Sequence, residues 1–178
     1  DLLNFLFADD TSLYDSADDL IDLIASFKRK LDPFLVWIKF NQLSVNWNKT
    51  KFMIISKKRK HVSAIKSIVI NSNDVEVVDD FKLLGCIIDN KLSFNLHVNN
   101  VKKLINRKLY AINKIFFLSA NVKLHFFKAF ILPHFDYCNS LSIYLTKNSI
   151  DSLAKLYSVC LFRLFGLKLF GVDIYDQA

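Results

Sequence analysis

The spacing of apolar residues changes near residue 90, and this change most restricts the folds open to the chain. Before it, short apolar runs alternate with turn-forming residues, apart from one helical stretch between residues 17 and 38. After it, apolar residues recur every three or four positions over long stretches, as amphipathic helices require. Strands followed by helices predict an α+β protein, with a sheet-based half in residues 1–94 and a helical half in residues 95–178.

Asp9 and Asp10 lie between two short apolar segments near the start of the chain. Residues 2–8 and 11–14 have the composition of strands, and aspartate is common in turns. We therefore expect a β-hairpin with paired strands and with Asp9 and Asp10 as its turn.

Other elements are expected from the same patterns. The helix at residues 17–38 contains Pro33, which should kink or split it because proline lacks the N–H that a helix interior needs. The turn-forming residues 71–74 predict a second hairpin. The expected strands are residues 52–56, 68–70, 75–78 and 81–88, and the expected helices are residues 95–118, 122–132 and 150–167. Pro133 should end the second of these helices.

The net charge of +7 is unevenly distributed along the chain. Residues 1–27 carry seven Asp and no Lys or Arg, whereas residues 28–68 carry eleven basic residues and one acid. Residues 102–128 add seven basic residues and no acid. An acidic segment that could bind a metal ion, next to two basic segments that could bind phosphates, is what a metal-dependent enzyme acting on nucleic acid would need. Solvated helix faces without a partner account for the charges equally well.

Composition excludes several classes of protein. No apolar run approaches the roughly 18 residues that span a bilayer, and no secretory signal is present, so we expect no membrane partner and an intracellular protein of the nucleus or cytoplasm. Three widely spaced cysteines, Cys86, Cys138 and Cys160, fit neither a disulfide framework nor a zinc motif. We expect them to be buried, reduced thiols. The first residue, Asp1, opens inside an apolar run, which suggests a fragment of a longer chain.

Asp9 and Asp10 are the residues best suited to chemistry. Two close carboxylates repel each other and so favour a divalent cation as counter-charge. Oxygen ligands suit Mg²⁺, and two such ions about 4 Å apart can stabilise the attacking and leaving oxygens in phosphoryl transfer. Taken alone, however, an Asp-Asp pair is most often a hydrated turn.

Several motifs, in a fixed order, resemble those of non-LTR retrotransposon reverse transcriptases. In that family, the palm hairpin carries an aromatic residue, any residue, and then Asp-Asp-Thr. Asn-x-Leu-Ser-x-Asn and Lys-Thr-Lys follow, then the primer-grip block Phe-x-x-Leu-Gly with Ile-Asp-x-x-Leu-Ser, and finally Leu-Pro-x-x-x-Tyr-Cys. The corresponding segments here are residues 7–11, 41–46, 49–51, 81–85, 88–93 and 132–138. The resemblance extends from about Leu2 to Leu167.

The resemblance implies a role for each of these segments. Residues 1–94 would form the C-terminal half of a polymerase palm, an antiparallel sheet with a helix, and residues 95–178 a helical thumb-like bundle with the connection that follows it. Asp9 and Asp10 would be the catalytic, metal-binding pair. Lys49 or Lys51 would donate a proton to the departing pyrophosphate, although a simple phosphate or water contact suits either lysine as well.

The resemblance also implies two nucleic-acid contacts. Gly85 would let a backbone approach closely because it has no side chain, with a strand bulge as the alternative. The primer-grip residues would be Phe81, Lys82, Leu83, Leu84 and Gly85, and the thumb residues that contact the duplex would be Lys102, Lys103, Arg107, Lys108 and Lys114. Solvated outer faces are the alternative for the thumb residues.

The implied parent enzyme is an RNA-directed DNA polymerase that uses an RNA template, a DNA primer, deoxynucleotides and two Mg²⁺ ions. Its palm carries a further Asp on an earlier strand, which has no counterpart here, so the two-metal site would be incomplete and the chain alone inactive. A catalytically dead nucleic-acid-binding remnant of such an element is the main alternative. An unrelated globular domain is the third.

Overall fold

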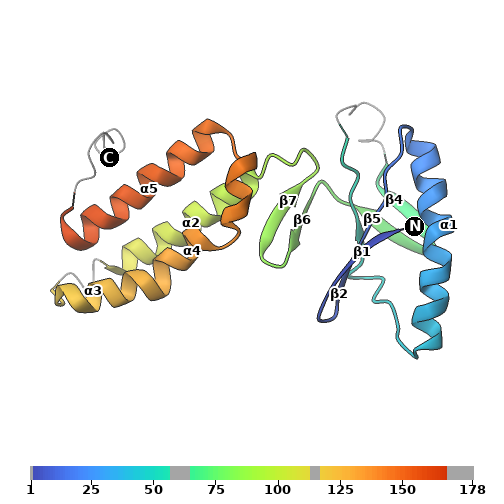
Figure 1. The fold of residues 1–178 in the computed structure, drawn as a ribbon, viewed down its shortest axis with the longest axis horizontal. Helices are drawn as coiled ribbons and strands as arrows, with labels where there is room; N and C mark the ends of the chain where they lie inside the picture. The colour runs from blue at the N-terminus through green and yellow to red at the C-terminus, as the bar shows by residue number, and fades with distance from the viewer. Residues whose placement is uncertain (1, 57–64, 113–116, 168–178) are drawn as a thin grey trace. The chain divides into compact units, whose positions relative to one another are not determined.

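The structure, a computed structural model, describes residues 2–56, 65–112 and 117–167 (Figure 1). Small sheets and several helices confirm the α+β class. The chain divides into two compact units, Asp1–Val78 and Asp79–Ala178. Residues 79–94, which the sequence groups with the sheet-based half, therefore belong to the unit that contains most of the helices. The assignment of residues 1–94 to a palm and 95–178 to a thumb stays a prediction.

The first unit opens with the predicted hairpin. Strands β1 (Leu3–Phe7) and β2 (Asp10–Tyr14) are antiparallel, with Phe7 opposite Asp10. The paired strands are confirmed, but the position of the turn is corrected. It consists of Ala8 and Asp9, and Asp10 is already paired in β2. Ala8 has a φ of 52°, which a two-residue hairpin turn of this kind requires.

A three-stranded sheet forms the rest of the β-structure in this unit, in the order β3-β5-β4. Strands β4 (Ser67–Ile70) and β5 (Asn73–Val77) form the second expected hairpin. Its turn residues, Asn71 and Ser72, have φ values of 46° and 62°, as in a type I′ turn. The strand expected at residues 52–56 is shorter, because only β3 (Lys51–Phe52) pairs, in parallel with β5.

Helix α1 (Leu20–Phe40) packs against this sheet and runs through Pro33 without interruption. Pro33 was expected to kink or split the helix, and the continuous helix shows that it does not split it. Pro33 is exposed, so water can bond the carbonyl that its missing N–H leaves free. On the opposite face, packing holds the helix in place, because Leu31 forms a buried cluster with Ile68, Ile70 and Val75 of the sheet. The side chain of Asp19 caps the N-terminus by accepting a 2.8 Å hydrogen bond from the N–H of Ile21.

The second unit opens with a hairpin where the sequence suggested one strand over residues 81–88. Strands β6 (Asp80–Leu83) and β7 (Cys86–Asp89) are antiparallel. Leu84 and Gly85 form the turn between them, with φ values of 46° and 88°. Such values fit a type I′ turn, which reverses the chain inside an otherwise continuous apolar run.

The remainder of the second unit contains helices joined by short turns and no strand among its described residues, as predicted. Its elements are α2 (Asn95–Ile112), α3 (Ala120–Phe126), the π-helical segment η1 (Phe127–Ile131), α4 (Leu132–Asp136), the 3₁₀ segment η2 (Asn139–Tyr144) and α5 (Lys147–Phe165). Helices α2 and α5 run side by side (Figure 1). The buried core comprises Val101, Ile105, Leu109, Phe127, Ile131, Leu156, Cys160 and Leu164.

Several helix boundaries differ from expectation, and two of the differences concern the helices expected at residues 95–118 and 122–132. Helix α2 covers the expected helix as far as Ile112, where the described residues stop, and residues 117 and 118 are not helical. Pro133 does not end a helix but lies in the first turn of α4, directly after the π-helical segment. Proline fits there because a first-turn N–H needs no partner within the helix. Within the described ranges, no helix combines the length and apolarity needed to cross a membrane.

Candidate active site and nucleic-acid interface

The hairpin β1–β2 presents Asp9 and Asp10 on an exposed surface. Because side chains alternate along a strand, Asp10 shares one face with Phe7 and Tyr14. The rings of Phe5 and Tyr14 are in edge-to-face contact on this face, with their centroids 5.6 Å apart. Phe5 and Phe7 are 59% and 64% exposed, so the face that carries Asp10 is open and apolar. Two adjacent carboxylates are thereby placed at the tip of a hairpin.

The acid that directly follows this hairpin, Asp15, has a structural partner. Asp15 forms an ion pair with Lys30, with 2.7 Å between the carboxylate oxygen and the ammonium nitrogen. The hydrogen bond from Lys30 is the largest of the effects that lower the pKa of Asp15. Among the described residues, no group of three His, Cys, Asp or Glu side chains could hold a metal ion. Within the described part of the chain, Asp9 and Asp10 thus form a pair without a third side chain of these types beside them.

The structure distinguishes the two candidate lysines. The Nζ of Lys51, at the start of β3, lies 2.6 Å from a carboxylate oxygen of Glu76, so its charge is already paired. Lys49 lies in the preceding turn and is exposed, and its backbone N–H donates to the Oδ1 of Asn46 at 3.2 Å. Of the two, Lys49 is the cation that is free to meet a phosphate, within the part of the chain that the structure describes.

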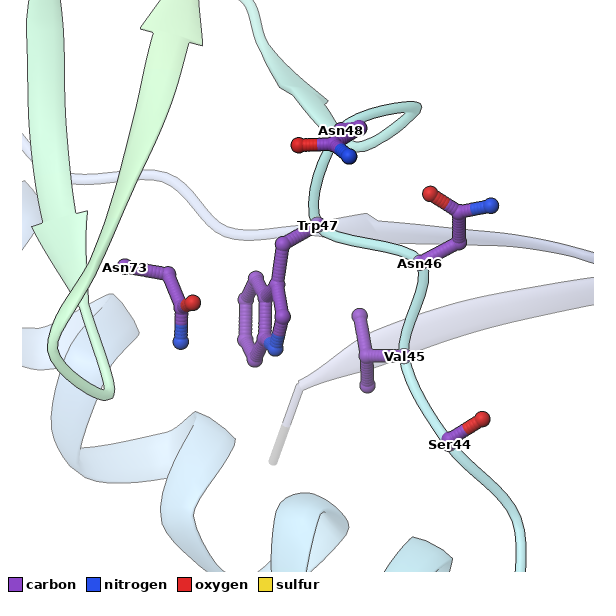
Figure 2. A pocket seen from close by; sticks show the side chains of 6 residues that line it. All are labelled: Ser44, Val45, Asn46, Trp47, Asn48 and Asn73. Atoms are coloured by element: carbon purple, nitrogen blue, oxygen red, sulfur yellow. The ribbon is translucent and has the colours of Figure 1, made fainter.

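A shallow pocket of about 490 Å³ lies beside this turn (Figure 2). No lining side chain is charged: they are Ser44, Val45, Asn46, Trp47, Asn48 and Asn73. Figure 2 shows the indole of Trp47 between Asn73 and Val45. Three of the lining residues belong to the segment 41–46 that matches the family block Asn-x-Leu-Ser-x-Asn, so this block forms a surface recess next to Lys49.

The hairpin β6–β7 carries the five predicted primer-grip residues and has one packed and one exposed strand. In β7, Cys86 and Asp89 are buried, and the N–H of Ile87 donates to the Nδ1 of His97 in α2 at 3.4 Å. Burial lowers the pKa of His97, which keeps its ring neutral and able to accept this bond. In β6, Phe81 and Lys82 are exposed. The exposed strand is the one that a nucleic acid could reach.

The ring of Tyr137, from the same unit, occupies the space beside Gly85 where a side chain would project. A Cβ at Gly85 would lie 3.1 Å from the Cε1 of Tyr137, and the hydroxyl of Tyr137 donates to the carbonyl of Leu84. Tyr137 and Leu84 belong to two separate motifs, residues 132–138 and 81–85. The fold thus brings these two motifs into contact.

The predicted thumb residues on helix α2 differ in their exposure and in their hydrogen bonds. Lys103 and Arg107 are exposed and one turn apart on the face opposite the buried Ile105. The Nζ of Lys108 instead donates to the carbonyl of Phe130 at 2.8 Å and lies 5.7 Å from the centre of the Phe130 ring. Lys102 is half-buried. The remaining predicted residue, Lys114, lies outside the described residues.

Comparison with known proteins adds one relative. The chain is 21% identical to the RNA-directed DNA polymerase from mobile element jockey of Drosophila melanogaster. The alignment is 172 positions long and covers 93% of the chain but 18% of the jockey polymerase. No protein-family model matches the chain. No solved structure matches it either. The chain thus has a distant relative named as an RNA-directed DNA polymerase, and the alignment with it extends over nearly the full length of the chain.

Asp89 is a structural residue whose role the sequence did not reveal. Its buried carboxylate accepts hydrogen bonds from the backbone N–H groups of Lys91, Ser93 and Phe94 and from the Ser93 hydroxyl, at 2.7–3.1 Å. These bonds hold the turn between β7 and α2. The spacing Asp89-x-x-x-Ser93 before a helix is the signal that could have indicated this role. In the alignment of motifs, Asp89 is the Asp of the segment 88–93.

The cysteines agree with the expectation of free thiols. Cys86 and Cys160 are buried, whereas Cys138 is only half-buried, which corrects the expectation for that residue. Burial is the main cause that raises the pKa of Cys86 to about 11, and the neighbouring Cys138 adds to it. Burial likewise raises the pKa of Cys160 to about 12. Both buried thiols are therefore protonated and unreactive at neutral pH.

Proposed function

We propose that this chain is part of a retrotransposon RNA-directed DNA polymerase, and that it forms the C-terminal half of the palm together with the thumb. One observation carries the proposal: two adjacent carboxylates stand at the tip of an exposed hairpin in a chain that aligns over 93% of its length with such a polymerase. The order of the later motifs along the chain supports it. The substrates would be a DNA primer on an RNA template and deoxynucleotides.

Asp9 and Asp10 would hold Mg²⁺. The fit is good for part of a coordination shell, because Mg²⁺ is commonly bound through one or two carboxylates together with water and substrate phosphates. When bound, the metal would neutralise charge on the reacting phosphates. A further carboxylate would have to come from outside the described residues, none of which completes a three-residue cluster. Lys49, whose ammonium has no carboxylate partner among them, would contact a phosphate.

The primer–template duplex would contact two exposed surfaces of the second unit. One is strand β6 with Phe81 and Lys82, and the other is the face of α2 with Lys103 and Arg107. Contacts of basic side chains with phosphates position a duplex without reading its sequence, as a polymerase requires.

Metal binding can be tested without catalysis. In an NMR titration with Mn²⁺, we expect paramagnetic broadening centred on residues 8–11. The double substitution Asp9→Asn and Asp10→Asn should weaken this binding by at least about tenfold, because the site loses both anionic ligands. Asp151→Asn, which changes an exposed aspartate in α5, is the control and should leave the broadening unchanged. Broadening that survives the double substitution would contradict the assignment of the metal site.

Primer extension tests the enzymatic part of the proposal. The purified 178-residue chain, given an RNA template, a DNA primer, deoxynucleotides and Mg²⁺, is expected to add no nucleotide. The reason is that two carboxylates alone do not hold and orient both ions of a two-metal site. Extension that is abolished by Asp9→Asn and Asp10→Asn would show that the chain completes its own site. Nucleic-acid binding without any Mn²⁺ binding would instead favour a catalytically dead remnant.

A further inference from the structure

The hairpin β6–β7 is held on one side only. Strand β7 is fixed to α2 through its buried side chains and through the bond from Ile87 to His97. Strand β6 pairs with β7 alone among the described strands, and its Phe81 and Lys82 are exposed. The orientation of the exposed strand therefore depends on what holds the turn that joins it to β7.

That turn has a backbone conformation that needs support. Leu84 has a φ of 46°, in the left-handed region that residues with a Cβ rarely adopt, and Gly85 has a φ of 88°. A non-glycine residue remains in this region when its surroundings hold it there. The surroundings of Leu84 and Gly85 therefore matter for the geometry of the whole hairpin.

Tyr137 supplies this support from a segment about fifty residues away in the sequence. Its hydroxyl donates a hydrogen bond to the carbonyl of Leu84, and its ring covers the side of Gly85 where a Cβ would project, at 3.1 Å. Tyr137 directly follows α4, and its own N–H donates to the carbonyl of Pro133 at 2.9 Å. The turn is thus tied to the helical body of the unit.

We propose that Tyr137 is a positioning residue that fixes the β6–β7 turn, and thereby the exposed strand β6, for contact with the end of the primer. This inference rests on the proposed polymerase function. It gives a physical reason for Gly85. Any side chain at that position would meet the Tyr137 ring, and a residue other than glycine would have an unfavourable φ there. It also gives a reason for a tyrosine rather than a phenylalanine at position 137, because only the hydroxyl bonds Leu84.

The test compares Tyr137→Phe, which keeps the ring and loses the hydroxyl, with Tyr137→Ala, which loses both. Tyr144→Phe is the matched control, because Tyr144 is also exposed in this unit but its ring contacts Phe94 rather than the hairpin. Two readouts are needed. One is amide hydrogen exchange in β6 and β7, and the other is photocrosslinking from a reactive nucleotide at the 3′ end of a DNA primer on an RNA template.

In the unchanged chain, we expect the primer end to crosslink to residues 80–89. In Tyr137→Phe, exchange in β6 and β7 should be roughly five- to tenfold faster, as expected for the loss of one hydrogen bond, while exchange in α5 stays the same. The crosslink to the hairpin should fall by a similar factor, and overall affinity for the duplex should change less than twofold. Tyr137→Ala should show larger effects of the same kind, and Tyr144→Phe none.

The outcomes separate this inference from the proposed function. Unchanged exchange and crosslinking in Tyr137→Phe would overturn the positioning role and leave the polymerase proposal standing. Faster exchange throughout the unit would also overturn it, because Tyr137 would then support the fold in general. No crosslink between the primer end and the hairpin in the unchanged chain would refute the primer contact itself. Hydrogen exchange would then still decide whether Tyr137 holds the turn.

Discussion

Asp89→Asn is expected to destabilise the second unit by roughly 2–4 kcal/mol, because hydrogen bonds to a buried charged group are among the stronger ones. Asp89 is only 7% exposed, and its carboxylate accepts four hydrogen bonds in the turn before α2. An asparagine can accept on one side only, and its NH₂ would face the donors that now bond the other oxygen. The change should be measured by urea denaturation followed by circular dichroism.

The control for this prediction is Asp80→Asn. Asp80 lies directly opposite Asp89 in the hairpin but is exposed, so its substitution should change the free energy of unfolding by less than about 0.5 kcal/mol. Equal effects of the two substitutions would contradict the role assigned to Asp89.

The same carboxylate predicts a dependence of stability on pH. Burial alone would raise the pKa of Asp89, but its hydrogen bonds from Ser93, Lys91 and Phe94 outweigh burial, so the pKa lies below the usual value. A group with a lowered pKa in the folded state stabilises above its unfolded pKa, and this contribution is lost as the pH falls through the folded pKa. The Asp89→Asn variant should therefore lose less stability than the unchanged chain on acidification below about pH 4.

Binding of an RNA–DNA duplex by the chain is expected to weaken roughly a hundredfold between 50 and 200 mM salt, if about four phosphates are contacted. Lys103 and Arg107 should carry two of these contacts, because they are exposed on one face of α2. Replacing both with glutamine should reduce the slope of log affinity against log salt by about two. Fluorescence anisotropy over a salt series measures both quantities.

Lys108→Gln provides the comparison for this experiment. It removes one positive charge from the same helix, half of what the double substitution removes, but Lys108 is bonded to the carbonyl of Phe130 and should contribute little to the slope. An affinity that does not depend on salt would contradict binding through phosphates. A change of slope for Lys108→Gln that reaches half the change seen in the double substitution would contradict the selection of Lys103 and Arg107.

Local patterns in the sequence were sufficient for the elements that depend on local physics. The two hairpins of the first unit follow from short apolar runs that flank turn residues, and the helices of the second unit follow from their periodicity. The hairpin β6–β7 was missed because residues 81–88 are largely apolar and their turn, Leu84-Gly85, lacks the Asn or Asp that usually marks it. The helix is not split at Pro33, because packing of α1 on its sheet outweighs the local preference of proline.

The candidate site was predictable in its residue types but not in its contacts. Charge patterning identified the basic segments, yet it could not show that Lys51 is paired with Glu76 or that Lys108 is bonded to Phe130. Such contacts join residues 25 and 22 positions apart, and only the folded chain defines them. For the same reason no local signal revealed that Tyr137 reaches the β6–β7 turn.

The π-helical segment η1, which precedes α4, affects the direction in which the side chain of Tyr137 points. A π-helical turn contains about one residue more than an α-helical turn, so it acts as a one-residue insertion that the helix absorbs without breaking. In an ordinary α-helix each residue advances the chain by about 100° around the axis. Deleting one residue from Phe127–Ile131 should therefore turn this segment into an ordinary α-helical turn and leave Tyr137 facing the hairpin, whereas a deletion in a regular α-helical turn would rotate everything after it by about that angle. Homologues with a single-residue gap at this point should still direct the tyrosine at the hairpin.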